Sequence, residues 1–267
     1  MKIVIITGEE SGDELGASLV DALRSSGLNE FELFGIGGSL LLERGMTNFH
    51  HIKEINVMGI IEVIPKILQI KKIINNVTET ILELKPDIVV SIDSPDFTLR
   101  IAKKLKSRNS NIKILHYVAP SVWGWRPNRI YTVKSAVDKL LTILPFEKKL
   151  FEEKQVATTY VGHPITDKIK PKITFDDFNN KYIAGNKKPI LLILPGSRKP
   201  EIDKLLNVYL NAVENYKFYD NFSLVLPIKK QLASYVRNII KAKNISFDVT
   251  ILDNEEAKYE SFVVADY

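Results

Sequence analysis

The chain has 267 residues, of which 45% are apolar and 26% charged, the balance of a globular protein with enough material for one or two cores. Its formal net charge of +5 is too small to argue for a nucleic-acid partner and favours an anionic one, such as a phosphorylated substrate or an acidic membrane surface. The absence of cysteine from the sequence excludes disulfides and thiolate metal sites.

The N-terminal stretch carries only a short apolar run, Ile3 to Ile6, followed by an acidic pair. A signal peptide needs a longer apolar region, and a membrane-spanning helix needs about 18 or more apolar residues. We therefore expect a cytosolic protein that at most rests on a membrane.

Short apolar, β-branched runs alternate with segments of helical spacing along the chain. The predicted strands are 2–7, 31–38, 87–93, 113–118, 139–144, 189–195, 222–227 and 248–252, and the clearest helices are 13–26, 60–84 and 97–107. Such alternation predicts an α/β fold with parallel sheets covered by helices on both faces.

A polar stretch at 163–188 interrupts this pattern, and a new strand, turn and helix follow it as at the start of the chain. We predict two Rossmann-like domains, 1–165 and 166–267, with a cleft between them. Ligands of such sheets bind beyond the carboxyl ends of the strands, so the motifs at strand ends carry the functional argument.

The first such motif is TGEESGD, residues 7–13. Its two glycines allow a tight turn, and Ser11 or Asp13 is suited to cap the following helix. This capping interpretation is as strong as the interpretation that the loop binds a ligand. The acidic pair Glu9–Glu10 and the lack of a phosphate-loop lysine argue against a nucleotide phosphate here and favour sugar hydroxyls.

The second motif, SIDSPDF, places Asp93 at the end of a buried strand. This residue is suited to act as a general base, as a metal ligand together with Asp96, or as a turn former. From the residues alone the turn former is favoured.

The third motif, HYVAPSVWGWRPNR, holds both tryptophans, Trp123 and Trp125, beside Arg126 and Arg129. Either the tryptophans fill a core, or they face a sugar or acyl chain while an arginine binds a phosphate. The prolines favour a rigid loop, and functional groups collect on such loops.

The fourth motif, LPGSRKPEI, follows an apolar strand and opens a helix. Gly196 and Ser197 are expected to present backbone N–H groups at the helix start with Arg198 close by, which is an arrangement suited to anions. The alternative is a helix simply capped by the serine.

The segment 60–77 has helical spacing with additional apolar and basic positions. These are Ile61, Leu68, Ile73, Lys66, Lys71 and Lys72. Two interpretations of this pattern are equally good. Either the helix packs on the sheet, or its basic surface rests on anionic lipid or admits acyl chains.

Taken together, the motifs resemble one family. TGEESGD, VMGIIEV, KPDIVVSIDSPDF, HYVAPSVWGWRPNR, LPFEK, VGHP and LPGSR occur in the order, and at about the spacing, of lipid-A-disaccharide synthase, over essentially the whole chain. The resemblance implies an inverting glycosyltransferase of the two-domain GT-B fold that joins UDP-2,3-diacylglucosamine to 2,3-diacylglucosamine 1-phosphate. The products are a β-1,6 disaccharide 1-phosphate and UDP, and neither a metal nor another cofactor is implied.

The resemblance also implies roles for residues. Asp93 matches the catalytic carboxylate that takes the proton from the acceptor 6-hydroxyl. The implied substrate-binding residues are Glu9, Ser11, Met58, Trp123, Trp125, Arg126 and Arg129, and the implied nucleotide-phosphate site is Gly196, Ser197 and Arg198. The implied partners are the two acyl sugars and the anionic cytoplasmic face of a Gram-negative inner membrane, with a homo-oligomer as a further possibility and no nucleic acid.

The family's second domain continues beyond the position equivalent to Tyr267, so we expect this domain to be incomplete and the chain to be a fragment or split gene product. Such a chain is expected to bind UDP poorly, to show little activity and to aggregate through the face after Val264. Two alternatives stay open, namely a UDP-sugar 2-epimerase-like enzyme and a non-catalytic remnant that binds lipid or a partner chain.

Overall fold

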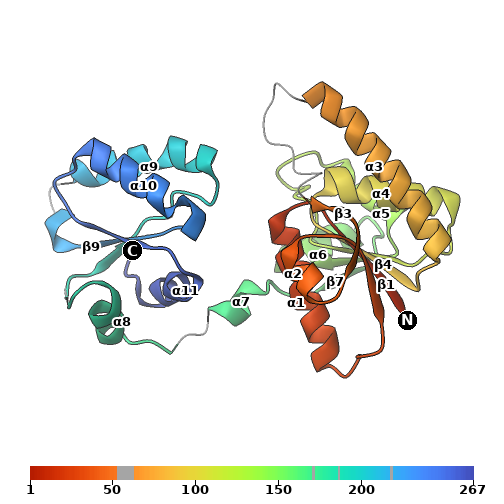
Figure 1. Cartoon of the computed structure of the whole chain (residues 1–267), viewed down its shortest axis with the longest axis horizontal. Coiled ribbons are helices and arrows are strands. Elements are labelled where there is room, and N and C mark those ends of the chain that lie inside the picture. Colours follow the sequence, from red (N-terminus) through yellow and green to blue (C-terminus); the bar gives the residue numbers. More distant parts are fainter. Residues whose placement is uncertain (53–62, 170–171, 186, 217–218) are drawn as a thin grey trace. The chain divides into compact units, whose positions relative to one another are not determined.

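A computed structural model describes residues 1–52, 63–169, 172–185, 187–216 and 219–267. The chain forms two compact units, Met1–Pro164 and Ile165–Tyr267 (Figure 1). The predicted Met58 and Ile61 lie outside the described residues.

The first unit is built on a parallel seven-stranded sheet. Its strands are β1 (Lys2–Thr7), β2 (Glu32–Gly37), β3 (Thr47–His51), β4 (Ile88–Ile92), β5 (Ile114–Tyr117), β6 (Lys139–Thr142) and β7 (Thr158–Tyr160). They lie in the order β3-β2-β1-β4-β5-β6-β7, so the winding reverses between β1 and β4. Ligands of open α/β sheets bind at this reversal, outside the carboxyl ends of the strands.

Helices cover both faces of this sheet. They are α1 (Glu10–Ser25), α2 (Ser39–Glu43), α3 (Val63–Leu84), α4 (Pro95–Arg108), α5 (Arg129–Ala136) and α6 (Pro145–Glu152). The helices α1 and α2 pack on one face through Val20 and Leu41, whereas α3 and α4 pack on the other through Ile81 and Ile101 (Figure 1). Phe151 of α6 joins a cluster with α4 and α5.

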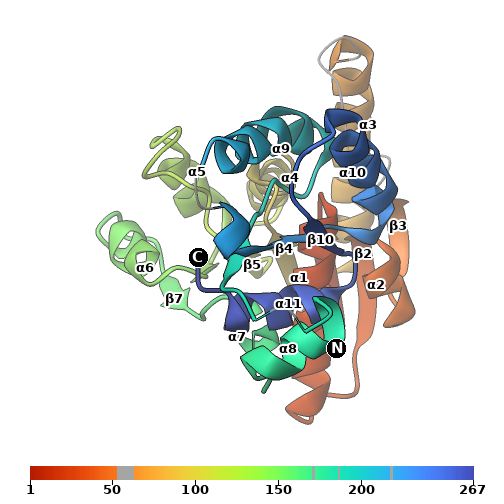
Figure 2. The same ribbon diagram turned by 90° about the vertical axis from the view of Figure 1, so that its left-hand side faces the viewer.

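The second unit repeats this arrangement around a three-stranded parallel sheet in the order β10-β9-β8. Its elements are α7 (Ile165–Lys168), α8 (Phe175–Tyr182), β8 (Ile190–Leu192), α9 (Lys199–Glu214), η2 (Tyr219–Asn221), β9 (Ser223–Pro227), α10 (Lys230–Lys243), β10 (Val249–Leu252) and α11 (Glu255–Val264). Figure 2 shows α9 and α10 on one face of the sheet and α8 and α11 on the other, in agreement with the two core clusters of this unit.

After α11 the backbone runs beside β8. The N–H of Leu192 donates to the carbonyl oxygen of Tyr267 at 2.8 Å, and the N–H of Tyr267 donates to that of Ile190 at 3.2 Å. The strand β8 therefore has hydrogen-bond partners on both sides, β9 on one and residues 266–267 on the other.

The α/β class expected from the alternating pattern is confirmed. Every predicted strand is present, β1 with the predicted bounds and the others with somewhat shorter ones. Two strands were not predicted. The first, β3, is the polar sequence TNFHH, and the second, β7, has only three residues, so neither carries an apolar run that marks a strand.

The positions of residues in α3 bear on the two interpretations of the segment 60–77, namely packing on the sheet and contact with lipid. Ile73 is 5% exposed and joins the core with Val77, which agrees with the packing interpretation at this position. Leu68 is 60% exposed, and Lys71 and Lys72 beside it are exposed as well. Within the described ranges, no helix has both the length and the apolar character needed to cross a bilayer.

A buried histidine lies in the middle of the first sheet. His116 of β5 is 0% exposed, and its Nδ1 lies 2.8 Å from Oγ of Ser91 in β4. Its Nε2 has no hydrogen-bond partner in the part of the chain that the structure describes. Burial lowers the pKa of His116 from 6.5 to about 4, since a charged imidazole here would lose its hydration.

His116 should therefore destabilise the fold in acid. Because its folded pKa is depressed, the unfolded chain binds the proton first, and the loss begins as pH falls through about 6.5 and continues to about 4. The free energy of unfolding should fall by about 1.4 kcal/mol per pH unit from this group. Urea titrations between these pH values should show a shallower dependence for His116→Asn.

The control is His163→Asn, which removes a partly exposed imidazole of the loop after β7 and leaves His116 in place. If the free energy of unfolding of His116→Asn depended on pH as steeply as that of the wild type, burial of His116 would not be the cause of the loss of stability in acid.

Candidate active site

The loops that follow β1 and β4 lie against each other at the reversal point of the first sheet. A Cβ atom placed on Gly8 would lie 2.6 Å from Cβ and 2.7 Å from Oγ of Ser94, so only glycine allows this approach. Gly12 likewise faces Thr7 and the carbonyl oxygen of Ile92, at 3.1 and 3.5 Å from its hypothetical Cβ. The structure thus brings the TGEESGD and SIDSPDF motifs together.

Asp93 is the residue directly after β4, and its backbone is unusual. Asp93 and Ser94 both have left-handed backbones, with φ of 49° and 42°. Val118, at the end of the neighbouring β5, has φ of 77°, which is rare for a β-branched residue. Strained backbones of this kind cluster at functional sites, which supports a role beyond turn formation for the carboxylate of Asp93.

Glu9 and Ser11 lie on the adjacent loop. Glu9 is the N-cap residue of α1 and partly exposed, whereas Ser11 lies in the first turn of that helix and is exposed. Both stand at the carboxyl end of β1, beside the end of β4 that carries Asp93. The side chain of neither residue caps α1, so the capping interpretation of Ser11 is wrong.

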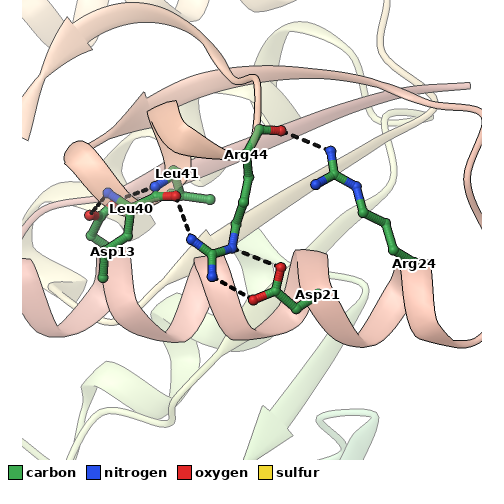
Figure 3. Close-up of polar contacts among 6 residues, drawn as sticks. All are labelled: Asp13, Asp21, Arg24, Leu40, Leu41 and Arg44. Carbon is green, nitrogen blue, oxygen red and sulfur yellow. Dashed lines mark hydrogen bonds and ion pairs between the residues drawn. The ribbon is translucent and has the colours of Figure 1, made fainter.

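Asp13 does cap a helix, but not the one predicted. It is 3% exposed, and its carboxylate accepts a hydrogen bond from the N–H group of Gly38 at 2.7 Å. It also accepts hydrogen bonds from the N–H groups of Leu40 at 3.0 Å and Leu41 at 3.3 Å (Figure 3). These groups belong to the start of α2, so Asp13 links α1 to α2. Its role is structural, because its oxygens are taken up by backbone donors.

A second link between the same helices lies farther along. Arg44, after α2, forms two hydrogen bonds with the carboxylate of Asp21 at 2.5 and 2.8 Å, and Arg24 donates to the carbonyl oxygen of Arg44 at 2.8 Å (Figure 3). The hydrogen bond from Arg44 lowers the pKa of Asp21. This pair is partly exposed, unlike Asp13.

The tryptophans of the third motif are on the surface. Trp123 is 46% and Trp125 62% exposed, so the core interpretation is wrong. Both stand in the loop between β5 and α5, which is the carboxyl end of the sheet. Part of each ring is therefore accessible at the edge where ligands of such sheets bind.

The two arginines of this loop meet the same carboxylate. Arg126 lies 3.3 Å from Oδ1 of Asp96, and Arg129 forms an ion pair with Oδ2. The guanidinium of Arg126 also lies 5.1 Å from the ring centroid of Trp125, a cation–π contact. Because Asp96 is held by two arginines, it is poorly placed to serve as a metal ligand with Asp93.

Phe146 is an aromatic neighbour that the sequence analysis missed. It lies in the first turn of α6, is 51% exposed and meets Trp123 edge to face with ring centroids 4.9 Å apart. The signal was present, because the LPFEK motif follows a strand as the other motifs do. The next residue, Glu147, is buried, and its pKa is raised by that burial while it accepts the N–H of Leu144.

The fourth motif lies in the second unit, after β8. Gly196 has φ of 119°, and Arg198 is the N-cap residue of α9. The backbone N–H groups of Ser197 and Arg198 both donate to Oε2 of Glu201, at 2.8 and 3.2 Å. The predicted anion-binding groups are thus occupied by a carboxylate of the chain itself, and these hydrogen bonds lower the pKa of Glu201.

Metal-ligating side chains do not converge. Across the described ranges, no three His, Cys, Asp or Glu side chains are grouped so that they could hold an ion.

Comparison with known proteins identifies the family. The family model LpxB, described as lipid-A-disaccharide synthetase, matches residues 3–267. The chain belongs to the lipid-A-disaccharide synthase family. It is 34% identical to the lipid-A-disaccharide synthase of Blochmanniella pennsylvanica, covering 99% of this chain and 67% of the relative. The Idiomarina loihiensis synthase is 36% identical over 96% of this chain and 68% of its own length. The synthase of Myxococcus xanthus is 40% identical over 80% of this chain and 55% of its own. The chain therefore spans about half to two thirds of the length of these relatives.

Several solved structures share the fold of this chain. The UDP-GlcNAc 2-epimerase from Neisseria meningitidis, bound to UDP-GlcNAc, matches 99% of this chain and 76% of its own with a TM-score of 0.65 at 15% identity. The lipopolysaccharide outer core galactosyltransferase WaaB matches 98% of this chain and 71% of its own chain, with a TM-score of 0.53 at 13% sequence identity. At such identities the likeness shows the fold alone, and it confirms the expected two Rossmann-like units of the GT-B type.

The link made by Asp13 should be a main contributor to the stability of the first unit. Asp13→Ala leaves buried N–H groups at the start of α2 without an acceptor, and the free energy of unfolding in urea should fall by about 2–3 kcal/mol. Asp21→Ala, the control from the same helix, removes a partly exposed ion pair and should cost about 1 kcal/mol or less. Equal losses in the two variants would show that the buried cap is not special.

Proposed function

We propose that this chain acts in lipid A synthesis as a glycosyltransferase that joins UDP-2,3-diacylglucosamine to 2,3-diacylglucosamine 1-phosphate. The products are the β-1,6 disaccharide 1-phosphate and UDP. The observation that carries the proposal is the placement of Asp93 in a left-handed turn at the reversal point of the first sheet, within a family match over residues 3–267.

Asp93 is the proposed general base. Its carboxylate takes the proton from the acceptor 6-hydroxyl while that oxygen forms a bond to the anomeric carbon of the donor. The bond from the anomeric carbon to the UDP oxygen breaks, and UDP leaves with the electron pair. Attack from the face opposite UDP inverts the anomeric centre. The partly exposed position of Asp93 at the strand end supports this role.

The acceptor side is proposed to lie on the first unit. Glu9 and Ser11 bind sugar hydroxyls, and Trp123 and Trp125 offer exposed rings to sugar and acyl chains. Arg126 and Arg129 bind the acceptor phosphate, for which Asp96 is the competing anion. Met58 remains a proposed contact outside the described residues.

The nucleotide-phosphate site is proposed to lie on the second unit at Gly196, Ser197 and Arg198. Positive charge on Arg198 stabilises the leaving diphosphate, and neither a metal nor another cofactor is proposed. We also propose a peripheral location on the cytoplasmic face of the inner membrane, which the exposed Leu68, Lys71 and Lys72 support. A homo-oligomer is compatible with the proposal, and no nucleic acid takes part.

A UDP-sugar 2-epimerase is the competing function, because proteins with that activity share the fold. The exposed tryptophans beside an arginine cluster favour a lipid acceptor instead. The purified chain should release UDP only when both acyl sugars are present. Conversion of UDP-GlcNAc to its 2-epimer without UDP release would favour the epimerase.

Asp93→Asn should abolish most of the transfer. The amide keeps the size of the side chain but takes no proton, so kcat should fall by about 10²–10⁴-fold. The thermal midpoint should stay close to that of the wild type. Asp203→Asn, on an exposed helix face of the second unit, is the control and should leave kcat unchanged. Near-normal turnover by Asp93→Asn would remove this carboxylate from the mechanism.

Glu201 should compete with the nucleotide. Glu201→Gln removes the negative charge that occupies the N–H groups of Ser197 and Arg198, so UDP should bind several-fold more tightly, about 1 kcal/mol. Calorimetric titration measures this change. Glu214→Gln at the other end of α9 is the matched control. Weaker UDP binding by Glu201→Gln would mean that the carboxylate organises the loop for the phosphate instead of competing with it.

A further inference from the structure

We propose that Thr98 is a positioning residue, whose hydroxyl holds the left-handed Asp93–Ser94 turn and so directs the carboxylate of Asp93 beyond the edge of the sheet. Thr98 belongs to α4 and is not among the residues to which the family resemblance gives a role. The inference rests on the proposed function for its kinetic part only.

The peptide groups on both sides of Asp93 are fixed. Its N–H donates to the carbonyl oxygen of Tyr117 in β5 at 2.9 Å. Its carbonyl oxygen lies 2.6 Å from Oγ1 of Thr98, which donates to it, while the carbonyl oxygen of Ser94 lies 3.2 Å from the same hydroxyl. Thr98 is 0% exposed, so water does not compete for this hydrogen bond.

This hold is needed because the turn is unfavourable by itself. Left-handed conformations are costly for residues with a Cβ atom, and here two such residues follow one another. Strained backbones of this kind persist only where surrounding contacts fix them. If the turn relaxed, the Cα–Cβ bond of Asp93 would point in a different direction and carry the carboxylate with it.

Gly8 supports the turn from the opposite side. Its lack of a Cβ lets Ser94 pack against the β1–α1 loop, with Cβ of Ser94 only 2.6 Å from the position that a Gly8 side chain would take. Oγ of Ser94 is buried without a hydrogen-bond partner among the described residues. Packing therefore fixes Ser94, whereas the hydrogen bond from Thr98 fixes Asp93.

The bond made by Thr98 differs from a common helix contact. Threonine hydroxyls often donate to the carbonyl four residues back, as Thr78 of α3 does to Ile74 at 2.6 Å. The nearer acceptor of Thr98 lies five residues back, outside the helix, on the residue that carries the proposed base. Thr78 is equally buried, which makes it a matched control.

The test uses Thr98→Val, Thr98→Ser and Thr78→Val in the 267-residue chain. A strong intraresidue amide–Hα NOE marks a positive φ and reports on the turn at Asp93 and Ser94 without any substrate. Thr98→Val should lose this signal, Thr98→Ser should keep it, and Thr78→Val should keep it although it loses a similar buried hydrogen bond.

In the transfer assay, Thr98→Val should lower kcat by about 10–100-fold with little change in KM, since a displacement of about 1 Å costs up to about 100-fold. The serine variant should restore kcat, and Thr78→Val should leave it unchanged. A retained NOE in Thr98→Val, or equal loss of kcat in Thr98→Val and Thr78→Val, would overturn the proposal. Absence of transfer by the wild-type chain would contradict the proposed function and agree with the alternative of a non-catalytic remnant, while the NOE would still decide the role of Thr98.

If Thr98→Val does not fold, Gly8→Ala tests the same turn from the other side. It should remove the NOE at Ser94, because the added methyl group would collide with Cβ of Ser94. An NOE at Ser94 that survives Gly8→Ala would show that packing against Gly8 is not what fixes Ser94.

Discussion

The contact between Gly8 and Ser94 is the constraint on which the site of the first unit depends. A parallel sheet brings the carboxyl ends of β1 and β4 side by side, but it does not by itself decide how closely the following loops approach. Here a missing Cβ on one loop lets the other pack directly against it. The strained turn at Asp93 thus stands in a fixed place relative to Glu9 and Ser11, which is what a reaction between oriented groups requires.

Most of the fold could be predicted from the sequence because its main signals are local. Apolar runs such as 2–7 and 222–227 mark buried strands by themselves, and helical spacing marks α1, α3 and α4. The four motifs TGEESGD, SIDSPDF, HYVAPSVWGWRPNR and LPGSRKPEI could also be placed at strand ends, where the structure has them. Local signals do not show which distant residue a polar side chain will contact.

Several features of the site are of that second kind. Asp13 was expected near the start of its own helix, yet its carboxylate serves α2, which begins 26 residues later. Asp96 meets arginines 30 and 33 positions away, and Phe146 meets Trp123 from the first turn of α6. Glu201 was overlooked for a different reason. It lies in the same turn as Arg198, but the sequence does not say whether a ligand or its own carboxylate takes the backbone donors.

The backbone beside β8 gives the two units a common plan. In the first unit the order of strands reverses after β3, when the chain passes through α3 and returns to the free side of β1 as β4. In the second unit it passes through α11 and returns to the free side of β8 at residues 266–267. The loops at 8–9 and 194–198 therefore hold equivalent positions, because each follows the strand at which the strand order of its unit reverses. Glu9 and Glu10 stand where the first loop enters α1, whereas Arg198 and Lys199 stand where the second loop enters α9. The same architectural position thus carries opposite charge in the two halves of the chain.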